Sequence, residues 1–198
     1  MLIVDHRRNT IEQLLETSQA FGVEVDIRSQ GKDLIIHHDP YERGILFETW
    51  LEVYNHSLLI INVKEEGLEE KIISLMIKYD INDYFFLDQS FPFLLKTSKF
   101  NPNCAVRVSE YETIETALSL AGMIRWVWLD TFKPLALLNI DVDTLVKSGF
   151  KICLVSPELQ GRIPEAECKE LVNFINKNNI TISAVCTKRP DLWGAKYE

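Results

Sequence analysis

Eight short apolar runs recur along the 198-residue chain, one in roughly every 25 residues. Stretches between them carry apolar side chains at the three- and four-residue spacing of a helix. This alternation predicts strand-helix units whose strands form a parallel sheet covered on both faces. The predicted strands are 2–4, 23–27, 58–63, 84–88, 105–108, 126–130, 151–155 and 182–186, and the clearest helices are 11–18, 68–76, 114–121 and 168–175.

Eight such units use up the whole chain, which favours a minimal (β/α)8 barrel forming one domain over residues 1–198. A doubly wound open sheet is the alternative. Thr10 is predicted to cap the first helix, and Ser109 with Glu112 has the spacing of a capping box. In a barrel of this kind the chemistry lies at the C-terminal ends of the strands and in the loops that follow them.

Composition excludes several classes of function. The chain has 21 Lys and Arg against 29 Asp and Glu, a net charge of −8, so a broad surface for nucleic acid is not expected. No apolar run approaches the roughly 18 residues of a membrane span, and no basic leader precedes an apolar stretch. These features predict a soluble, cytoplasmic protein without stable membrane insertion. The four cysteines are far apart and are expected to be buried, reduced thiols.

Two acidic residues share the second predicted strand. Glu24 and Asp26 are two positions apart, so their side chains point to the same face of the sheet. Two carboxylates facing the inside of a barrel stay ionised only beside a cation or strong donors, and oxygen ligands suit Mg²⁺ or Ca²⁺. The alternative is that both are solvated surface acids. We therefore predict a divalent cation as the cofactor.

Histidines lie near the same predicted edge. His6 follows the first strand, and His38 ends the segment LIIHHDP, which is expected to fold back as a β-hairpin after the second strand. Imidazole titrates near neutral pH, so this pair can serve as general acid and general base. A single histidine at a strand end is more often a hydrogen-bonded structural residue, and that alternative applies to each.

The order of these segments resembles the glycerophosphodiester phosphodiesterase family, within the phospholipase C-like phosphodiesterase barrels. The resemblance is dense over residues 1–64, reappears at 187–192 and is only topological in between. Its family motifs are HRG after the first strand, ENT opening the first helix, an ELDV-like strand, HDP, E-x-K and T-D-x-P. This chain has HR at 6–7, NT at 9–10, VEVDI at 23–27, LIIHHDP at 34–40, NVK at 62–64 and TKRP at 187–190.

The resemblance implies a phosphodiester hydrolase whose roles can be assigned residue by residue. His6 and His38 resemble the catalytic histidines. The divalent-metal ligands correspond to Glu24, Asp26 and, on the third strand, Asn62. The phosphate-facing cations of such a site correspond to Arg7 and Lys64.

Four departures from the family pattern bear on this assignment. Arg8 replaces the glycine of HRG, and the loop before NT is so short that the Glu of ENT is missing. Asn62 stands where the family has a Glu, which should weaken metal affinity and suit a more negative substrate. Only a short helical stretch, 46–54, remains where many relatives insert a segment over the substrate, so the pocket should be open and shallow.

Three functions follow as hypotheses. The first is a metal-dependent phosphodiesterase acting on a small phosphodiester. The second is a catalytically degenerate barrel that survives as a binding or scaffold protein, which Asn62 and the trimmed loops suggest. The third is an unrelated barrel enzyme with Lys64 as a Schiff-base former. The oligomeric state stays open, and exposed aromatic residues in the trimmed region could form the contact of a homo-oligomer.

Overall fold

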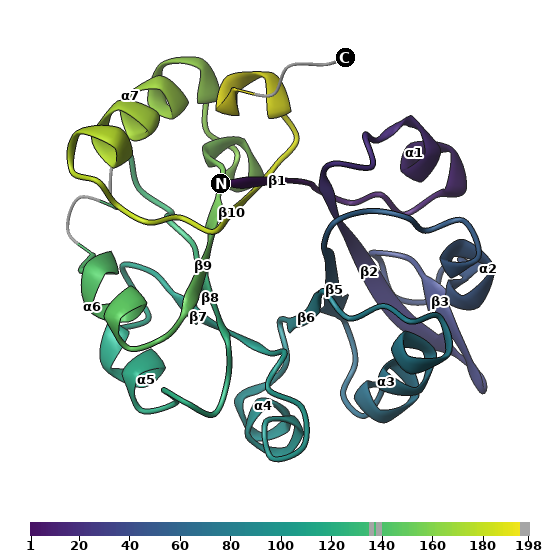
Figure 1. The fold of residues 1–198 in the computed structure, drawn as a ribbon. Coiled ribbons are helices and arrows are strands. Elements are labelled where there is room, and N and C mark those ends of the chain that lie inside the picture. The colour runs from purple at the N-terminus through teal and green to yellow at the C-terminus, as the bar shows by residue number, and fades with distance from the viewer. Residues whose placement is uncertain (135–136, 138–139, 195–198) are drawn as a thin grey trace. The chain divides into compact units, whose positions relative to one another are not determined.

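The computed structural model describes residues 1–134, 137 and 140–194, and the chain divides into two compact units. One unit combines Met1–Val4 with the chain from Ala105 onward, and the other runs from Asp5 to Cys104 (Figure 1). Each unit contains a part of the sheet and its own helices. The single domain over 1–198 stays a prediction.

In the first unit the strand order is β1-β10-β9-β8-β7, and β7 to β10 are parallel. Every residue of β7–β10 except Arg107 and Lys151 is buried, as expected for parallel strands with both faces covered. The strands are β1 (Leu2–Asp5, of which Asp5 belongs to the second unit), β7 (Ala105–Val108), β8 (Trp126–Leu129), β9 (Lys151–Val155) and β10 (Ala184–Thr187).

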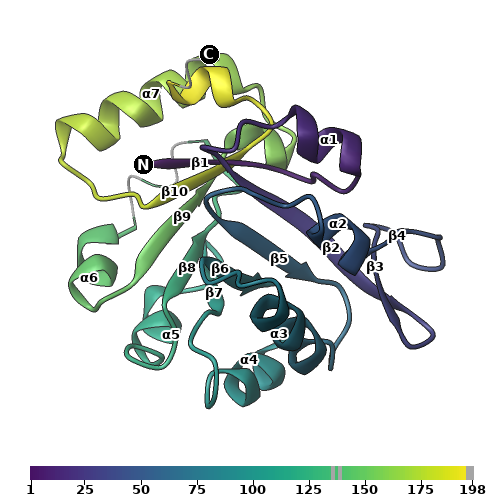
Figure 2. The same ribbon diagram turned by 45° about the vertical axis from the view of Figure 1, so that its right-hand side comes forward.

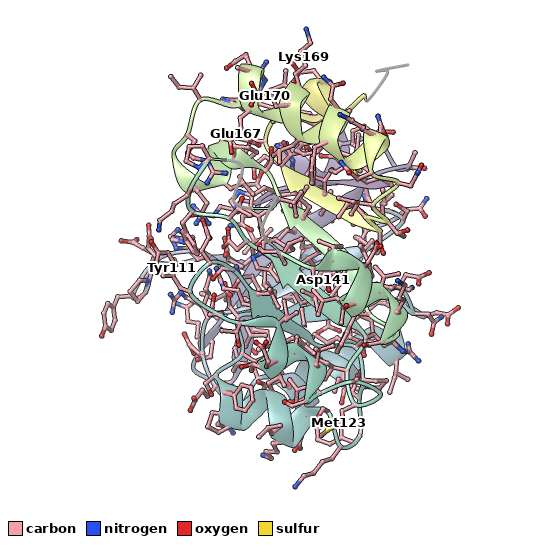
Figure 3. All side chains as sticks on the ribbon, turned by 90° about the vertical axis from the view of Figure 1, so that its left-hand side faces the viewer. Tyr111, Met123, Asp141, Glu167, Lys169 and Glu170 are labelled. Atoms are coloured by element: carbon pink, nitrogen blue, oxygen red, sulfur yellow. The ribbon has the colours of Figure 1, made fainter. Side chains whose placement is uncertain are left out.

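The helices of this unit follow their strands in the chain, and α7 illustrates how such a helix packs on the sheet. Its Cys168 and Leu171 are buried, while Lys169 and Glu170 face solvent (Figure 3). Spacing of this kind buries one stripe of a helix against the sheet. The helical segments are α5 (Ile114–Leu118), α6 (Val142–Lys147), α7 (Pro164–Lys177) and the 3₁₀ turns η2 (Pro157–Gln160) and η3 (Pro190–Trp193).

In the second unit the strand order is β4-β3-β2-β5-β6. Strands β2, β5 and β6 are parallel, whereas β3 folds back antiparallel along the second half of β2 (Figure 2). Strand β2 is long because its last residues serve this hairpin. The strands are β2 (Gly22–Gln30), β3 (Asp33–Ile36), β4 (Ile45–Leu46), β5 (Leu59–Val63) and β6 (Tyr84–Leu87).

Four helices complete this unit: α1 (Ile11–Glu16), α2 (Phe47–Leu51), α3 (Glu69–Lys78) and α4 (Phe91–Thr97). Thr10 caps α1 as predicted, because its hydroxyl accepts the Gln13 N–H and the Gln13 side chain accepts the Thr10 N–H. Helix α2 occupies the short helical stretch expected between the hairpin and the third predicted strand.

The α/β alternation predicted from the sequence is confirmed, since a strand lies within or overlaps each of the eight apolar runs. One local prediction is wrong. Ser109 and Glu112 bond each other in a turn, but the next helix begins at Ile114 and has Thr113 at its N-cap position. The four cysteines are buried and free, as expected, and burial raises the pKa of the Cys104 thiol to about 12. In the described part of the chain, no helix is long and apolar enough to cross a membrane.

Trp50 on α2 links the core of the second unit to the loop after β1. The side chain is fully buried, stacks on Tyr54 at 5.5 Å between ring centroids, and donates from Nε1 to the Arg8 carbonyl at 3.0 Å. A buried carbonyl that loses its donor costs free energy of desolvation. Trp50 therefore fixes the backbone of the loop after β1, which carries His6, Arg7 and Arg8.

Replacing Trp50 by Phe is expected to lower the free energy of unfolding by about 2 kcal/mol, because the Arg8 carbonyl loses its donor and the smaller ring leaves a gap. Urea denaturation followed by circular dichroism measures the change. Tyr41→Phe, at a fully exposed aromatic residue, is the control and should leave the midpoint unchanged. Equal midpoints for both variants would contradict the anchoring role of Trp50.

Candidate functional site

A cluster of polar side chains is buried where β2 and β5 run side by side. Glu24 and Asp26 lie on the same face of β2, and their side chains are 1% and 0% exposed. Asn62 on β5 is directly opposite Asp26 in the parallel register, and Lys64 follows the end of β5. The two acids are therefore buried rather than solvated surface residues, which excludes the alternative considered from the sequence.

The loop after β1 brings His6 and Arg7 to these acids. His6 Nε2 lies 3.7 Å from Glu24 Oε2, and the Arg7 backbone N–H donates to the same oxygen at 2.8 Å. Arg7 has a left-handed backbone with φ 54°, a conformation that costs a non-glycine residue about 1 kcal/mol or more. The hydrogen bond to a buried carboxylate offsets this strain. The next residue, Arg8, donates its N–H to the Glu24 carbonyl and pairs with Asp5 at 3.2 Å.

Asp26 is the most heavily engaged group of the cluster. Lys64 Nζ lies 3.1 Å from its Oδ1, and Arg7 Nε lies 3.5 Å from its Oδ2. Asn9 forms a reciprocal pair with it, donating from Nδ2 to Oδ2 at 2.8 Å and accepting the Asp26 N–H on Oδ1 at 3.1 Å. Asn9 belongs to the NT motif, but the sequence pattern predicts no role for it. An asparagine can bond many backbone groups, so its residue type alone does not predict the pairing with Asp26.

Glu24 differs from Asp26 in its electrostatic surroundings. Burial, and after it the neighbouring Asp26 charge, raise the pKa of the Glu24 carboxyl to about 7. The Arg7 N–H, the Asn62 amide and the Lys64 charge oppose these effects without cancelling them. Glu24 can therefore take up or release a proton near neutral pH, beside His6.

His38 lies after the hairpin strand β3, and a carboxylate orients its ring. Nδ1 of His38 is 2.7 Å from Asp39 Oδ1, and since a carboxylate only accepts, Nδ1 carries the hydrogen and Nε2 is left as the acceptor. This bond lowers the pKa of Asp39, and the Arg7 charge contributes to the same shift. Arg28 holds the His38 carbonyl through Nε and Nη2. The position of Asp39 in the segment LIIHHDP did not by itself predict its contact with His38.

The predicted metal ligands can be tested against these contacts. Glu24 Oε1, Asp26 Oδ1 and Asn62 Oδ1 are buried without a hydrogen-bond partner among the described residues. The third donor, Asp26, already faces Lys64 and Arg7. Among the described residues, no group of three or more His, Cys, Asp and Glu side chains is arranged to hold a metal ion. Asn62 is not one of these residue types, and with it Glu24 and Asp26 offer three buried oxygens of the kind that Mg²⁺ or Ca²⁺ takes. The residues present therefore fit a divalent ion, which stays a prediction from the sequence.

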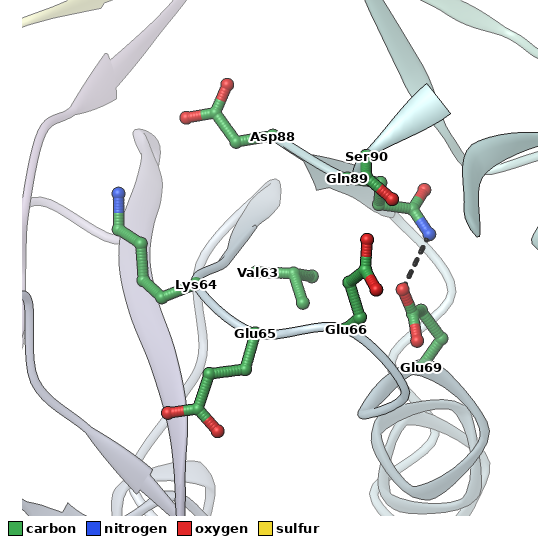
Figure 4. A pocket seen from close by; sticks show the side chains of 8 residues that line it. All are labelled: Val63, Lys64, Glu65, Glu66, Glu69, Asp88, Gln89 and Ser90. Carbon is green, nitrogen blue, oxygen red and sulfur yellow. Dashed lines mark hydrogen bonds between the residues drawn. The ribbon is translucent and has the colours of Figure 1, made fainter. Parts of the chain in front are cut away.

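A cavity adjoins the cluster on the side of β6. It has a volume of about 230 Å³, and Lys64 belongs to its wall as well as to the ion pair with Asp26. Asp88 and Lys64 stand on one side of this space, and Gln89 bonds Glu69 on the other (Figure 4). Four acids share the wall with this one lysine, so the cavity is acidic. The lining residues are Val63, Lys64, Glu65, Glu66, Glu69, Asp88, Gln89 and Ser90.

In the other unit, the polar groups after the strands bond one another. Asp130 accepts from Arg107 at 2.5 Å and from Gln160 at 2.8 and 2.9 Å. Thr187, which opens the TKRP segment, donates to Glu158 at 2.6 Å. These contacts give Asp130 and Thr187 a structural role in their own unit.

Comparison with solved structures identifies the fold. A glycerophosphodiester phosphodiesterase from Agrobacterium tumefaciens str. C58 superposes with a TM-score of 0.70 at 15% sequence identity, over 97% of each chain. A glycerophosphoryl diester phosphodiesterase from Parabacteroides distasonis ATCC 8503 superposes with a TM-score of 0.66 at 13% identity, over 96% of this chain and 84% of the other. The chain thus has a mixed α/β fold similar to that of these phosphodiesterases.

The sequence itself matches no protein-family model and no curated protein. The family resemblance read from short motifs is therefore supported by the fold, and not by overall sequence similarity.

Asp26→Asn is expected to lower the free energy of unfolding by about 2 kcal/mol, because Lys64 and Arg7 lose the buried charge that holds them, although both can turn toward solvent. Chemical denaturation at low salt measures the loss. Asp39→Asn changes an exposed carboxylate in the same way and serves as the control, with no change expected. A loss no greater for Asp26→Asn than for the control would show that the ion pairs contribute little to stability.

Proposed function

We propose that this chain, which shares the fold of glycerophosphodiester phosphodiesterases, binds and hydrolyses a small phosphodiester. One observation carries the proposal: His6, Arg7 and Lys64 converge on the buried pair Glu24 and Asp26. Phosphoryl chemistry needs cations for the phosphate and groups that move protons beside them. The cluster supplies both kinds of group.

Arg7 and Lys64 bind the phosphate in this proposal. Each of them forms one ion pair with Asp26, and the side chains of Arg7 and Lys64 remain 39% and 17% exposed. An ammonium has three donors and a guanidinium five, so each keeps donors for an incoming anion after pairing with Asp26. Negative charge that grows on the phosphate oxygens during bond cleavage is stabilised by cations that are already in position.

His6 and His38 move the protons. His38 Nδ1 donates a hydrogen bond to Asp39, which leaves Nε2 as the acceptor. A ring nitrogen that can accept a proton suits a general base. His6 lies beside Glu24, whose raised pKa lets the carboxyl exchange a proton with a neighbour at neutral pH. This arrangement suits proton delivery to the departing alcohol. A divalent ion would add charge on the phosphate, but no step here depends on one.

The closed (β/α)8 barrel, with both units in one domain, belongs to this proposal. Two observations support the barrel: the fold of the solved phosphodiesterases, and the eight apolar runs of the sequence, each of which contains or overlaps a strand.

A binding or scaffold role is the second candidate, and a specific observation favours it. Asn62 takes the place of a third carboxylate, and Lys64 is paired with Asp26. Such a site can hold an anion without turning it over. The same pair argues against a Schiff-base enzyme, since a paired ammonium is not the free amine that this chemistry requires.

His6→Ala and His38→Ala are each expected to reduce kcat/KM for bis(p-nitrophenyl) phosphate by about 100-fold or more, the usual contribution of a general acid or base. Release of p-nitrophenolate measures the rate. His37→Ala is the matched control, because His37 neighbours His38 and its ring bonds the Asp39 backbone rather than a side chain of the cluster; its rate should be unchanged.

Unchanged rates in both histidine variants would refute their catalytic role. A wild-type protein that binds a diester but never releases product would favour the binding function over hydrolysis.

A further inference from the structure

We infer that Asn9 is a positioning residue of the candidate site. It holds the Asp26 carboxylate in one orientation, so that Oδ1 is offered to a divalent cation together with Glu24 Oε1 and Asn62 Oδ1. This role goes beyond the proposed function, because it concerns the divalent ion that the sequence predicts, and its test does not require turnover. It gives the short loop after β1 the task of preparing oxygens that lie on two strands, β2 and β5.

The two buried acids share a pattern of bonding, in which the loop after β1 binds one oxygen of each. The Arg7 N–H donates to Glu24 Oε2 at 2.8 Å. Asn9 Nδ2 donates to Asp26 Oδ2 at 2.8 Å. The other oxygens, Glu24 Oε1 and Asp26 Oδ1, are buried and have no hydrogen-bond partner among the described residues. A buried oxygen without a donor costs free energy, and a bound cation would remove this cost.

Asn62 adds a third oxygen of the same kind. The residue is buried and lies directly opposite Asp26 in the register of β2 with β5. Within the described part of the chain, its Oδ1 also has no hydrogen-bond partner. Carboxylate and amide oxygens are the ligands that Mg²⁺ and Ca²⁺ prefer. The loop after β1 thus occupies one oxygen of each acid, and three oxygens on neighbouring strands stay available to an ion.

Asp26 needs a donor on Oδ2 because a carboxylate turns easily. Rotation about the last side-chain bond of an aspartate has a broad range, so the side chain alone does not select one of its two oxygens. Asn9 restricts this rotation with two bonds, since its Oδ1 also accepts the Asp26 N–H at 3.1 Å. Arg7 Nε reaches the same Oδ2 only at 3.5 Å and without hydrogen-bond alignment. The Asn9 amide is therefore the group that leaves Oδ1 facing the cluster.

Asn9 can act in this way because its own backbone is held on both sides. The Arg8 N–H donates to the Glu24 carbonyl at 2.8 Å, and Trp50 Nε1 donates to the Arg8 carbonyl at 3.0 Å. On the other side, Thr10 caps helix α1. A side chain orients a neighbour reliably only when it is itself fixed, and this loop meets that condition.

The Lys64 ammonium does not use up the oxygen that Asn9 leaves available. Nζ lies 3.1 Å from Asp26 Oδ1, but the contact is an ion pair without hydrogen-bond alignment. A carboxylate has about four lone-pair sites, so Oδ1 keeps one for an ion. Lys64 also lines the acidic cavity beside β6. A cation on Oδ1 would repel the ammonium toward the acids of this cavity, where it finds new partners.

Binding of Mn²⁺ to the full chain, followed by the electron paramagnetic resonance signal of the free ion, tests the inference. Mn²⁺ takes the same oxygen ligands as Mg²⁺ and Ca²⁺. Asn9→Ala should raise the Kd for Mn²⁺ by about tenfold or more, the usual effect of removing a group that orients a metal ligand. Thr10→Ala is the matched control. It removes the cap of α1 at the next residue, but the Thr10 side chain bonds Gln13 rather than an acid of the cluster, so the Kd should be unchanged.

Asn9→Ser is a second variant that keeps a polar residue in the loop. Its hydroxyl is one bond closer to the backbone than the amide groups of Asn9 and is too short to bond both the Asp26 N–H and Oδ2. It should therefore weaken Mn²⁺ binding as Asn9→Ala does, and circular dichroism verifies that each variant folds. No Mn²⁺ binding by the wild-type protein, an unchanged Kd in a folded Asn9 variant, or an equal loss of affinity in Thr10→Ala would each overturn the inference.

These outcomes are separate from those of the hydrolysis assay. A protein whose Mn²⁺ affinity depends on Asn9 but that releases no p-nitrophenolate keeps the inference and loses hydrolysis. A protein that hydrolyses the diester and binds no Mn²⁺ keeps the proposed function and loses the inference.

Discussion

The buried carboxylate of Asp26 is the group on which the rest of the site depends. An ionised carboxylate without solvent contact is stable only when paired charges and hydrogen bonds replace its water. Here Lys64, Arg7 and Asn9 supply them, from the end of β5 and from the loop after β1. One side chain on β2 thereby fixes three segments that are distant in sequence. The strained backbone of Arg7 donates its N–H to the neighbouring acid, Glu24, and Trp50 anchors the next residue, Arg8.

Two acids on one strand have acquired different properties from their surroundings. Asp26 faces two cations and Asn9, whereas Glu24 receives the Arg7 N–H and the Asn62 amide, and its burial together with the Asp26 charge raises its pKa to about 7. Pairs of carboxyls whose environments separate their pKa values are a recurrent basis for dividing roles in an active site. In this cluster Asp26 positions the cations, and Glu24 is the group that can exchange a proton with His6.

The strands were predictable because buried parallel strands read as continuous apolar runs, and all eight runs contain or overlap one. Helices α4 and α6, of seven and six residues, were not among the clearest predicted helices, although α1 and α5, of six and five residues, were. Length alone therefore does not decide which helices the apolar spacing reveals. The residues of the cluster were predictable from motif order, but their pairing was not. That Lys64 faces Asp26 depends on the register of β2 with β5 and on one rotamer, neither of which residue type encodes.

Asn62 is the departure from the family pattern that bears most directly on this cluster. Its backbone pairs with that of Asp26, and its side chain bonds Glu24 and lowers the pKa of that carboxyl against the effect of burial. Among the described residues, Glu24 Oε1, Asp26 Oδ1 and Asn62 Oδ1 are buried and have no hydrogen-bond partner. Because a buried oxygen without a donor costs free energy, a proton or a cation placed among these three oxygens would stabilise the cluster.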